Sequence, residues 1–599
     1  MDAHLAEVSA LLAQVGVAER DERQAMIIDP SQSSSDEYEQ LCAIIDDNGH
    51  FLTPELATFL KRKCQIELER SEVERAGRSL LHAQAISFHH QTTFQQFRRI
   101  QKRQESTQRP SIRRSHEDLF EPDTPDSPSD TPLDTLQRQI MTQQASILAE
   151  NHVEKVIRSL PDAWRVVQIN TQLFLQSRFK KESSEEAIRS TNLPLLITQI
   201  DCGQNELVKV AEVPSVKRSD RPTILSEFQE ILHTHRQIYT KNQKFDRVAY
   251  NQTRDELDDR LLTLLDTIEN RWLGFAKLTL LGRPKDPERV RLTDQAFKKC
   301  VTKLKLDHVQ KSWLWNALDG ASWLEEGHLV QVVELLTSDK TVAKALFKAV
   351  QEFGVNNPSA GVDRHPVVLI LDKDIQLLPW EALPMMKNQQ CSRVPSLFFL
   401  ASLYASHHQN KASVAKVGVN NEKIFYVLNP NNDLQKTQDR LESPFRALSL
   451  GEGFVGEWPS FPKIQGALSE MDAFMYCGHG SRLKTITSQE IEKLNIRALP
   501  LLFGCNSGRL ERLGRTFDPT GTASSYLIAS APCLLGFLWS VTDLDIDTWT
   551  VEFLEHWLEK RKGQKDFVKA VAEKRHCFKR LVNSAATVVY GLPSFFETR

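Results

Sequence analysis

The feature that most constrains the fold is a series of apolar, strand-length segments between residues 365 and 599. They read PVVLILDKD, KIFYVLNPN, DAFMYCG, ALPLLFG and APCLLGFLWS. The stretches that separate them, such as TSQEIEKLNI and GTASSYLIAS, suit crossover helices. Strands that are apolar on both faces and joined by helices form mostly parallel sheets with helices on both sides. The sequence therefore predicts an α/β domain over 356–599.

A second α/β region is predicted upstream, over 136–355. LPDAWRVVQINTQLF has the β-branched run of a buried strand, and NLPLLITQID resembles its partner. Between Thr223 and Leu280 the pattern changes to two long helices, which we expect to pack on the sheet as an antiparallel pair. The second helix carries an inward apolar stripe of Leu257, Leu261, Leu264, Leu265, Ile268 and Trp272.

The first part of the chain has a different character. Residues 1–110 have apolar side chains at helical spacings, which predicts an N-terminal helical region. Residues 111–135 are rich in Pro, Ser and Asp and predict a disordered acidic linker, because they bury too little apolar surface to offset the entropy of ordering. Thr124, Ser127 and Thr131 each precede a proline there, so phosphorylation by proline-directed kinases is a hypothesis.

The composition excludes several classes of protein. No apolar run approaches the roughly 20 residues that span a bilayer, and the N-terminus has no secretory signal pattern. Nine cysteines without CxxC spacing indicate reduced thiols inside the cell. The formal charge of −3 gives no basic field, so nucleic acid is not expected as a direct ligand. We interpret the local basic run as a solvated helix face: Arg98, Arg99, Lys102 and Arg103.

Two reactive side chains follow neighbouring predicted strands. His479 lies between glycines after DAFMYCG, and Cys505 follows the glycine that ends ALPLLFG. The spacing accommodates one crossover helix and one strand, so both side chains should face one crevice at the carboxyl edge of the sheet. Cleavage of a peptide by a thiol needs a nucleophile, a proton carrier and donors for the oxyanion. Cys505, His479 and the amides of Gly480 and Cys505 can supply them.

Other interpretations of these residues remain. Each can be an ordinary buried side chain, since small cysteines and hydrogen-bonded histidines are common in cores. A zinc site from Cys477, His479 and Cys505 is a third interpretation, but a fourth ligand with a recognisable spacing is missing. We therefore predict no metal and no cofactor.

Three segments carry a resemblance to a known family. MDAFMYCGHGS, LLFGCNSG and LWSVTDLDID resemble, in that order, the histidine box, the cysteine box and the following strand of separases, the caspase-fold proteases that open sister-chromatid cohesion. Further segments over 155–599 are also similar to separases: LILDKDIQLLPWEALP, FYVLNPNNDLQKTQ, LPDAWRVVQIN and RDELDDRLLTLLDTIENRWLG.

The resemblance implies a caspase-like, mostly parallel sheet flanked by helices, preceded by a pseudo-protease α/β domain with a long helical insert. It implies cleavage of the cohesin kleisin subunit after arginine, inhibition by a securin-type pseudosubstrate, and a place in the cytoplasm and, during mitosis, the nucleus and chromosomes. By the family pattern Asp547 contacts the substrate arginine, with Asp543 as the second candidate. Both acids can instead cap a helix N-terminus.

The sequence departs from the family pattern in three places. Arg482 follows the HGS motif where a small residue is frequent, and Asn506 replaces a frequent serine. Only residues 1–150 precede the protease-like region, so the chain resembles the short separases of insects, and a separate helical regulatory subunit is expected. Acidic-x-x-arginine patterns at Glu67–Arg70 and Glu72–Arg75 suggest self-cleavage only weakly, because such short patterns arise by chance.

Two competing functions stay open. The chain can be a noncatalytic scaffold with a caspase-like fold, although the intact His479 and Cys505 argue against this. It can also be a caspase-like protease that acts outside cohesion. The upstream pseudo-protease segments favour a separase, and a substrate screen would discriminate between them.

Overall fold

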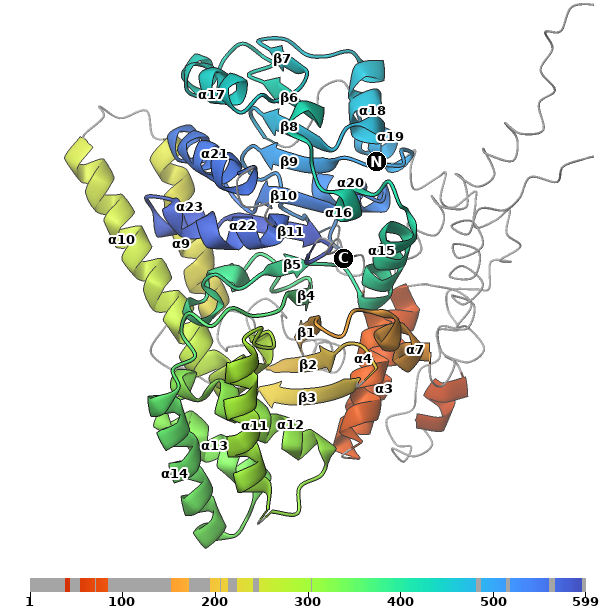
Figure 1. Cartoon of the computed structure of the whole chain (residues 1–599), viewed down its shortest axis with the longest axis vertical. Helices are drawn as coiled ribbons and strands as arrows, with labels where there is room; N and C mark the ends of the chain where they lie inside the picture. Colours follow the sequence, from red (N-terminus) through yellow and green to blue (C-terminus); the bar gives the residue numbers. More distant parts are fainter. Residues whose placement is uncertain are drawn as a thin grey trace, which may run out of the picture.

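One eleven-stranded sheet runs through the part of the chain that the structure, a computed structural model, describes (Figure 1). The described residues are 38–43, 54–70, 72–84, 152–171, 194–204, 206–213, 223–240, 247–302, 304–480, 486–512, 518–559 and 566–594. The strands, in chain order, are β1 (Arg165–Thr171), β2 (Leu195–Asp201), β3 (Leu207–Val213), β4 (Val367–Leu371), β5 (Cys391–Arg393), β6 (Ile424–Leu428), β7 (Gly453–Val455), β8 (Ala473–Cys477), β9 (Leu499–Phe503), β10 (Cys533–Phe537) and β11 (Thr587–Gly591).

The sheet is mostly parallel, as predicted. Its strand order is β3-β2-β1-β4-β5-β11-β10-β9-β8-β6-β7. Seven of the ten neighbouring pairs are parallel, and the antiparallel pairs are β1 with β2, β2 with β3, and β10 with β11. The strands β4, β6, β8, β9 and β10 coincide with the apolar segments of the sequence. Their near-complete burial explains why they are continuously apolar.

Four strands were not predicted from the apolar runs of the sequence. β5 and β7 have only three residues each, and β3 alternates buried residues with polar ones such as Glu212. β11 is apolar and lies antiparallel to β10. Its position between β10 and β5 depends on partners far away in the sequence, so it follows from the tertiary structure alone.

Helices cover the sheet on both faces (Figure 1). They are α3 (Pro54–Glu69), α4 (Val73–Ala83), α7 (His152–Ser159), α9 (Ile224–Thr240), α10 (Arg247–Asp266), α11 (Pro287–Val301), α12 (His308–Asp319), α13 (Glu326–Leu336), α14 (Lys340–Asn356), α15 (Leu397–Gln409), α16 (Val414–Val417), α17 (Gln435–Ala447), α18 (Phe461–Glu470), α19 (Ser488–Glu492), α20 (Thr522–Ile528), α21 (Asp543–Trp557), α22 (Phe567–Lys574) and α23 (Leu581–Ser584).

The predicted helical insert is present as α9 and α10, which lie side by side (Figure 1). α10 continues through a π-helical stretch, Thr267–Trp272, into the 3-10 stretch Gly274–Leu280. The whole predicted apolar stripe is buried in the core: Leu257, Leu261, Leu264, Leu265, Ile268 and Trp272. The helical spacing of these residues therefore identified the buried face correctly.

The two predicted α/β regions share one sheet. β1 pairs in parallel with β4 over five residue pairs, so hydrogen bonds cross the proposed boundary at 355/356. The division into 136–355 and 356–599 stays a prediction. Among the described residues, no helix has both the length and the apolar composition needed to cross a bilayer. The predicted linker 111–135, with its three proline-directed sites, and the basic run at residues 98–103 lie outside the described residues.

Candidate active site

His479 and Cys505 lie at the same end of two adjacent parallel strands. Cys477, the last residue of β8, pairs with Phe503, the last residue of β9. His479 and Cys505 each follow two positions later, so they occupy equivalent places beyond the strand ends. The structure therefore brings the two predicted residues to one edge of the sheet, where parallel α/β sheets place their ligands.

The turns that carry these residues are in backbone contact. A Cβ atom on Gly504 would lie 1.9 Å from the carbonyl oxygen of Gly480 and 2.8 Å from that of Gly478. Both distances are far below van der Waals contact, so only glycine fits at position 504. Gly480 has φ +68°, a left-handed conformation that favours glycine, and the space beside its Cα is open. The predicted oxyanion position is therefore uncrowded.

The thiol of Cys505 is held in its protonated form. Its Sγ donates a hydrogen bond to the carbonyl oxygen of Val541, at 3.3 Å. Burial raises the pKa of Cys505 and the negative charge of Asp543 raises it further, although hydrogen bonds of the Val541 backbone and the Ser540 side chain oppose the rise. Since the thiolate is the nucleophile, a base must remove the proton before or during attack.

The residues after Cys505 fix the turn. Asn506 has φ +60°, and its Nδ2 donates to Ser540 Oγ at 3.3 Å. Asparagine tolerates the left-handed region better than most residues, which accounts for its presence in place of a serine. The buried Ser507 donates to the carbonyl of Leu502 at 2.8 Å and accepts from the amide of Phe537 at 3.0 Å. The turn is thereby tied to both β9 and β10.

The backbone of His479 is fixed, whereas its ring is 55% exposed. Tyr476 donates from its hydroxyl to the carbonyl oxygen of His479 at 2.9 Å, and its ring stacks on Trp458 with centroids 5.9 Å apart. The imidazole Nε2 lies 3.9 Å from Asp433 Oδ1, which is too long for a hydrogen bond but within the range of an ion pair. A carboxylate therefore lies within ion-pair range of the His479 ring.

Asp433 is a candidate site residue that the sequence reasoning missed. It lies in the loop after β6, which the buried Asn429 organises: the Asn429 amide donates to the carbonyl of Cys477 at 2.9 Å. The Asn429 side-chain oxygen accepts from the amides of Asp433 and Leu434 at 3.0 and 2.8 Å. The usable signal was an Asn-rich turn, NPNND, that directly follows a strand end on the same edge of the sheet.

The two predicted arginine-binding aspartates have different surroundings. Asp547, 2% exposed, pairs through Oδ2 with Nη1 of Arg440 on α17. Burial raises the pKa of Asp547, although the bond from Arg440 opposes this rise. Asp543 is exposed in the first turn of α21 and acts electrostatically on Cys505. Asp543 is thus open to a ligand, and a ligand arginine reaches Asp547 only by displacing Arg440.

Three further predictions concern Arg482, a metal site and self-cleavage. Arg482 lies outside the described residues. No group of three or more His, Cys, Asp or Glu side chains able to hold a metal occurs within the described ranges, and Cys477 is buried in β8. Of the self-cleavage patterns, Glu67 is buried on α3 and accepts hydrogen bonds from Ser79 at 2.7 Å and Tyr38 at 3.1 Å, so the helix would have to open first.

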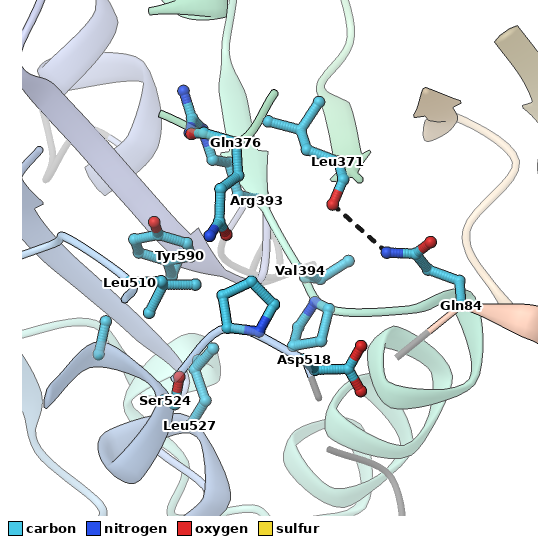
Figure 2. A pocket seen from close by; sticks show the side chains of 13 residues that line it. Gln84, Leu371, Gln376, Arg393, Val394, Leu510, Asp518, Ser524, Leu527 and Tyr590 are labelled. Atoms are coloured by element: carbon cyan, nitrogen blue, oxygen red, sulfur yellow. Dashed lines mark hydrogen bonds between the residues drawn. The ribbon is translucent and has the colours of Figure 1, made fainter. Parts of the chain in front are cut away.

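A separate pocket lies between Gln84, which follows α4, and α20 residues such as Ser524 (Figure 2). It is lined by residues that include Leu371, Leu510, Leu527 and Tyr590, and the Gln84 side chain donates to the carbonyl of Leu371 at 3.3 Å. Its volume of ≈ 50 Å³ is well below the roughly 300 Å³ at which ligand pockets begin, and it contains neither His479 nor Cys505. It is therefore not part of the candidate site.

Comparison with known proteins agrees with the resemblance. Residues 192–546, more than half of the chain, match the family profile described as Separin, protease domain. Separin from Mus musculus is 31% identical over 412 residues, which cover 67% of this chain and 19% of that protein. Separin from Schizosaccharomyces pombe is 28% identical over 496 residues, covering 76% and 26% respectively. The chain thus spans about a fifth to a quarter of the length of these relatives.

The fold also matches a solved structure. The crystal structure of the Saccharomyces cerevisiae separase–securin complex superimposes with a TM-score of 0.64 at 18% sequence identity, covering 93% of this chain and 37% of that chain. At this identity the match concerns the fold, and it agrees with the predicted caspase-like α/β class. From the extent of the profile match and the order of the shared segments, we conclude that this chain belongs to the separin, or separase, family.

Proposed function

We propose that this chain is a cysteine endopeptidase of the separase type. The observation that carries the proposal is the equivalent placement of His479 and Cys505 beyond two paired strands, with Gly504 packed on the carbonyls of Gly478 and Gly480. Any other residue at position 504 would push the two turns apart, so this glycine keeps His479 and Cys505 together.

The mechanism follows from the protonated thiol. His479 removes the proton from Cys505 as Sγ attacks the carbonyl carbon of the peptide. The oxyanion that forms accepts hydrogen bonds from the amides of Gly480 and Cys505. The protonated His479 then gives its proton to the leaving amine, and a thioester remains on Cys505. Water attacks the thioester with His479 as base, which releases the acid and restores the thiol.

The proposed substrate is the kleisin subunit of cohesin, cleaved after an arginine to separate sister chromatids. We expect a carboxylate that follows β10 to bind the side chain of that arginine. Asp543 is exposed beside Cys505, whereas Asp547 becomes accessible only when Arg440 moves away. The variants Asp543→Asn and Asp547→Asn distinguish the two candidates when cleavage after arginine is compared with cleavage after lysine. The variant that loses the preference for arginine identifies the aspartate that binds it.

The proposed partners are a securin-type inhibitor and a separate helical regulatory subunit. The securin-type inhibitor is supported by the structural neighbour, which is a separase in complex with securin. The chain is proposed to act in the cytoplasm and, in mitosis, at chromosomes in the nucleus.

The decisive experiment is cleavage of a kleisin fragment by the purified chain, free of inhibitor and supplied with any helical partner. Wild type is compared with Cys505→Ser, which removes the nucleophile while preserving the shape of the turn. We expect cleavage after arginine that the variant abolishes. A folded, partnered wild type that cleaves nothing would favour the scaffold, and cleavage of unrelated substrates alone would favour a protease outside cohesion.

A further inference from the structure

The helical insert reaches the catalytic edge of the sheet. Beyond β10 the chain runs through Trp539, Ser540 and Val541 before α21 begins, and the Val541 carbonyl accepts the hydrogen bond from the Cys505 thiol. α10 contacts α21 and α23 at this edge, and α9 lies beside α10 (Figure 1). The backbone that supports the thiol therefore lies against helices that come from residues 224–266.

One side chain of the insert bonds directly to this backbone. His235 on α9 is 2% exposed, and its Nε2 lies 2.7 Å from the carbonyl oxygen of Ser540. A carbonyl oxygen only accepts, so Nε2 carries the hydrogen and donates it. Burial lowers the pKa of His235, which keeps the ring neutral. The bonded peptide unit is the one that joins Ser540 to Val541.

Further contacts hold the same segment. Phe228 on α9 packs edge-on against Trp539 with ring centroids 5.6 Å apart, and the Trp539 carbonyl accepts from the amide of Asn506 at 3.4 Å. The Ser540 hydroxyl lies 3.3 Å from Asn506 Nδ2. The segment thus touches α9 on one side and the residue after Cys505 on the other.

The second helix of the insert binds the flanking elements. Asp258 on α10 accepts from the amide of Val582 at 2.8 Å, and Arg254 lies 3.7 Å from Asp545 in the first turn of α21. Trp539 in turn donates from Nε1 to the Val582 carbonyl at 2.9 Å. These contacts anchor α9 and α10 to the elements on either side of Val541, so a side chain on α9 has a fixed position relative to the thiol.

We propose that His235 is a positioning residue for Cys505, acting through the Ser540–Val541 peptide unit. The inference rests on the proposed function, because it takes Cys505 as the nucleophile. Without the His235 donor, the segment shifts, the Val541 carbonyl leaves the thiol, and the sulfur is no longer directed at the substrate. The hydrogen bonds of Val541 and Ser540 lower the pKa of Cys505, so a thiol that loses them is also harder to ionise.

The test compares two variants of similar volume in the full chain. His235→Gln keeps a side-chain N–H donor, and His235→Leu removes it without opening a large cavity. The matched control is His328→Leu: His328 is 8% exposed and bonds through Nε2 to the carbonyl of Asn270, also at 2.7 Å, but its bond lies outside the segment that supports Cys505.

Two readouts are measured, and we expect both to fall. We expect His235→Leu to lower kcat for a kleisin peptide about tenfold with KM within about twofold, since misdirection of the sulfur affects the chemical step. We expect alkylation of Cys505 at pH 7, followed by mass spectrometry of its peptide, to be about threefold slower, because fewer thiols are ionised. His235→Gln and His328→Leu should stay near wild type in both readouts.

The proposal is overturned if His235→Leu folds and leaves both values unchanged, or if His328→Leu reproduces its effects. If His235→Leu does not fold, His235→Gln decides alone: near-wild-type values support the proposal, and a tenfold fall in kcat overturns it. Alkylation needs no substrate, so an inactive wild type would refute the proposed function while the alkylation comparison would still test the role of His235.

Discussion

Gly504→Ala is the sharpest perturbation of the candidate active site. The added Cβ would lie 1.9 Å from the carbonyl oxygen of Gly480, where ordinary contact begins at 3.4 Å. The obstacle is backbone, so no side chain can rotate away. The turn that carries His479 and the turn that carries Cys505 must therefore separate by about 1.5 Å.

This displacement predicts a large loss of activity with a small loss of stability. Misplacement of catalytic groups by about 1 Å can reduce the rate about 100-fold. Insertion of a methyl group into a packed site costs about 1 to 3 kcal/mol of unfolding free energy. We therefore expect kcat/KM for a kleisin peptide to fall at least about 100-fold, while denaturation shows a folded chain.

The matched control is Gly466→Ala on α18, where a Cβ meets nothing within 4 Å. Alanine in the interior of a helix is favoured over glycine by about 0.5 to 1 kcal/mol, so this variant should be slightly more stable and fully active. If Gly504→Ala retains activity within about threefold of wild type, the contact between the two turns does not matter for catalysis and the reasoning is refuted.

Three further predictions concern charge. Arg440→Gln should lower the free energy of unfolding, measured with denaturant, by about 1 to 3 kcal/mol, because it leaves the buried Asp547 without its cation. This loss is smaller than that for a fully buried ion pair, since Arg440 is 31% exposed. Burial raises the pKa of Asp201, but Arg165, Arg283 and Lys209 together outweigh it and hold the pKa at about 2. Asp201 therefore contributes about 2 kcal/mol above pH 4 that is lost as the pH falls towards 2, and Asp201→Asn should remove that acid dependence. Alkylation of Cys505 should have its midpoint at a higher pH in the native than in the urea-unfolded chain, since burial raises its pKa; a lower native midpoint would contradict the protonated resting thiol.

Local patterns were sufficient for the main elements. The buried strands β8 and β9 were predictable because both faces are covered and every position is apolar. The stripe from Leu257 to Trp272 was predictable because a helix repeats every 3.6 residues. The positions of His479 and Cys505 followed from the same logic, since each comes directly after such a strand.

Long-range contacts were not predictable in this way. Whether Asp547 is open or paired depends on Arg440, more than 100 residues earlier, and the placement of Asp433 beside His479 depends on the pairing of β6 with β8. The contact of His235 with the segment that supports Cys505 joins elements 305 residues apart. No periodicity in the chain encodes these contacts.

Burial and backbone geometry act over a few residues, so the amino-acid sequence was sufficient to predict the long apolar strands, the mostly parallel α/β class and the two residues at the strand ends. The tertiary structure alone decided that both α/β regions share one sheet, which aspartate is paired, and that the thiol lies on a segment supported by the helical insert. These features depend on which surfaces meet, and only the folded chain specifies that.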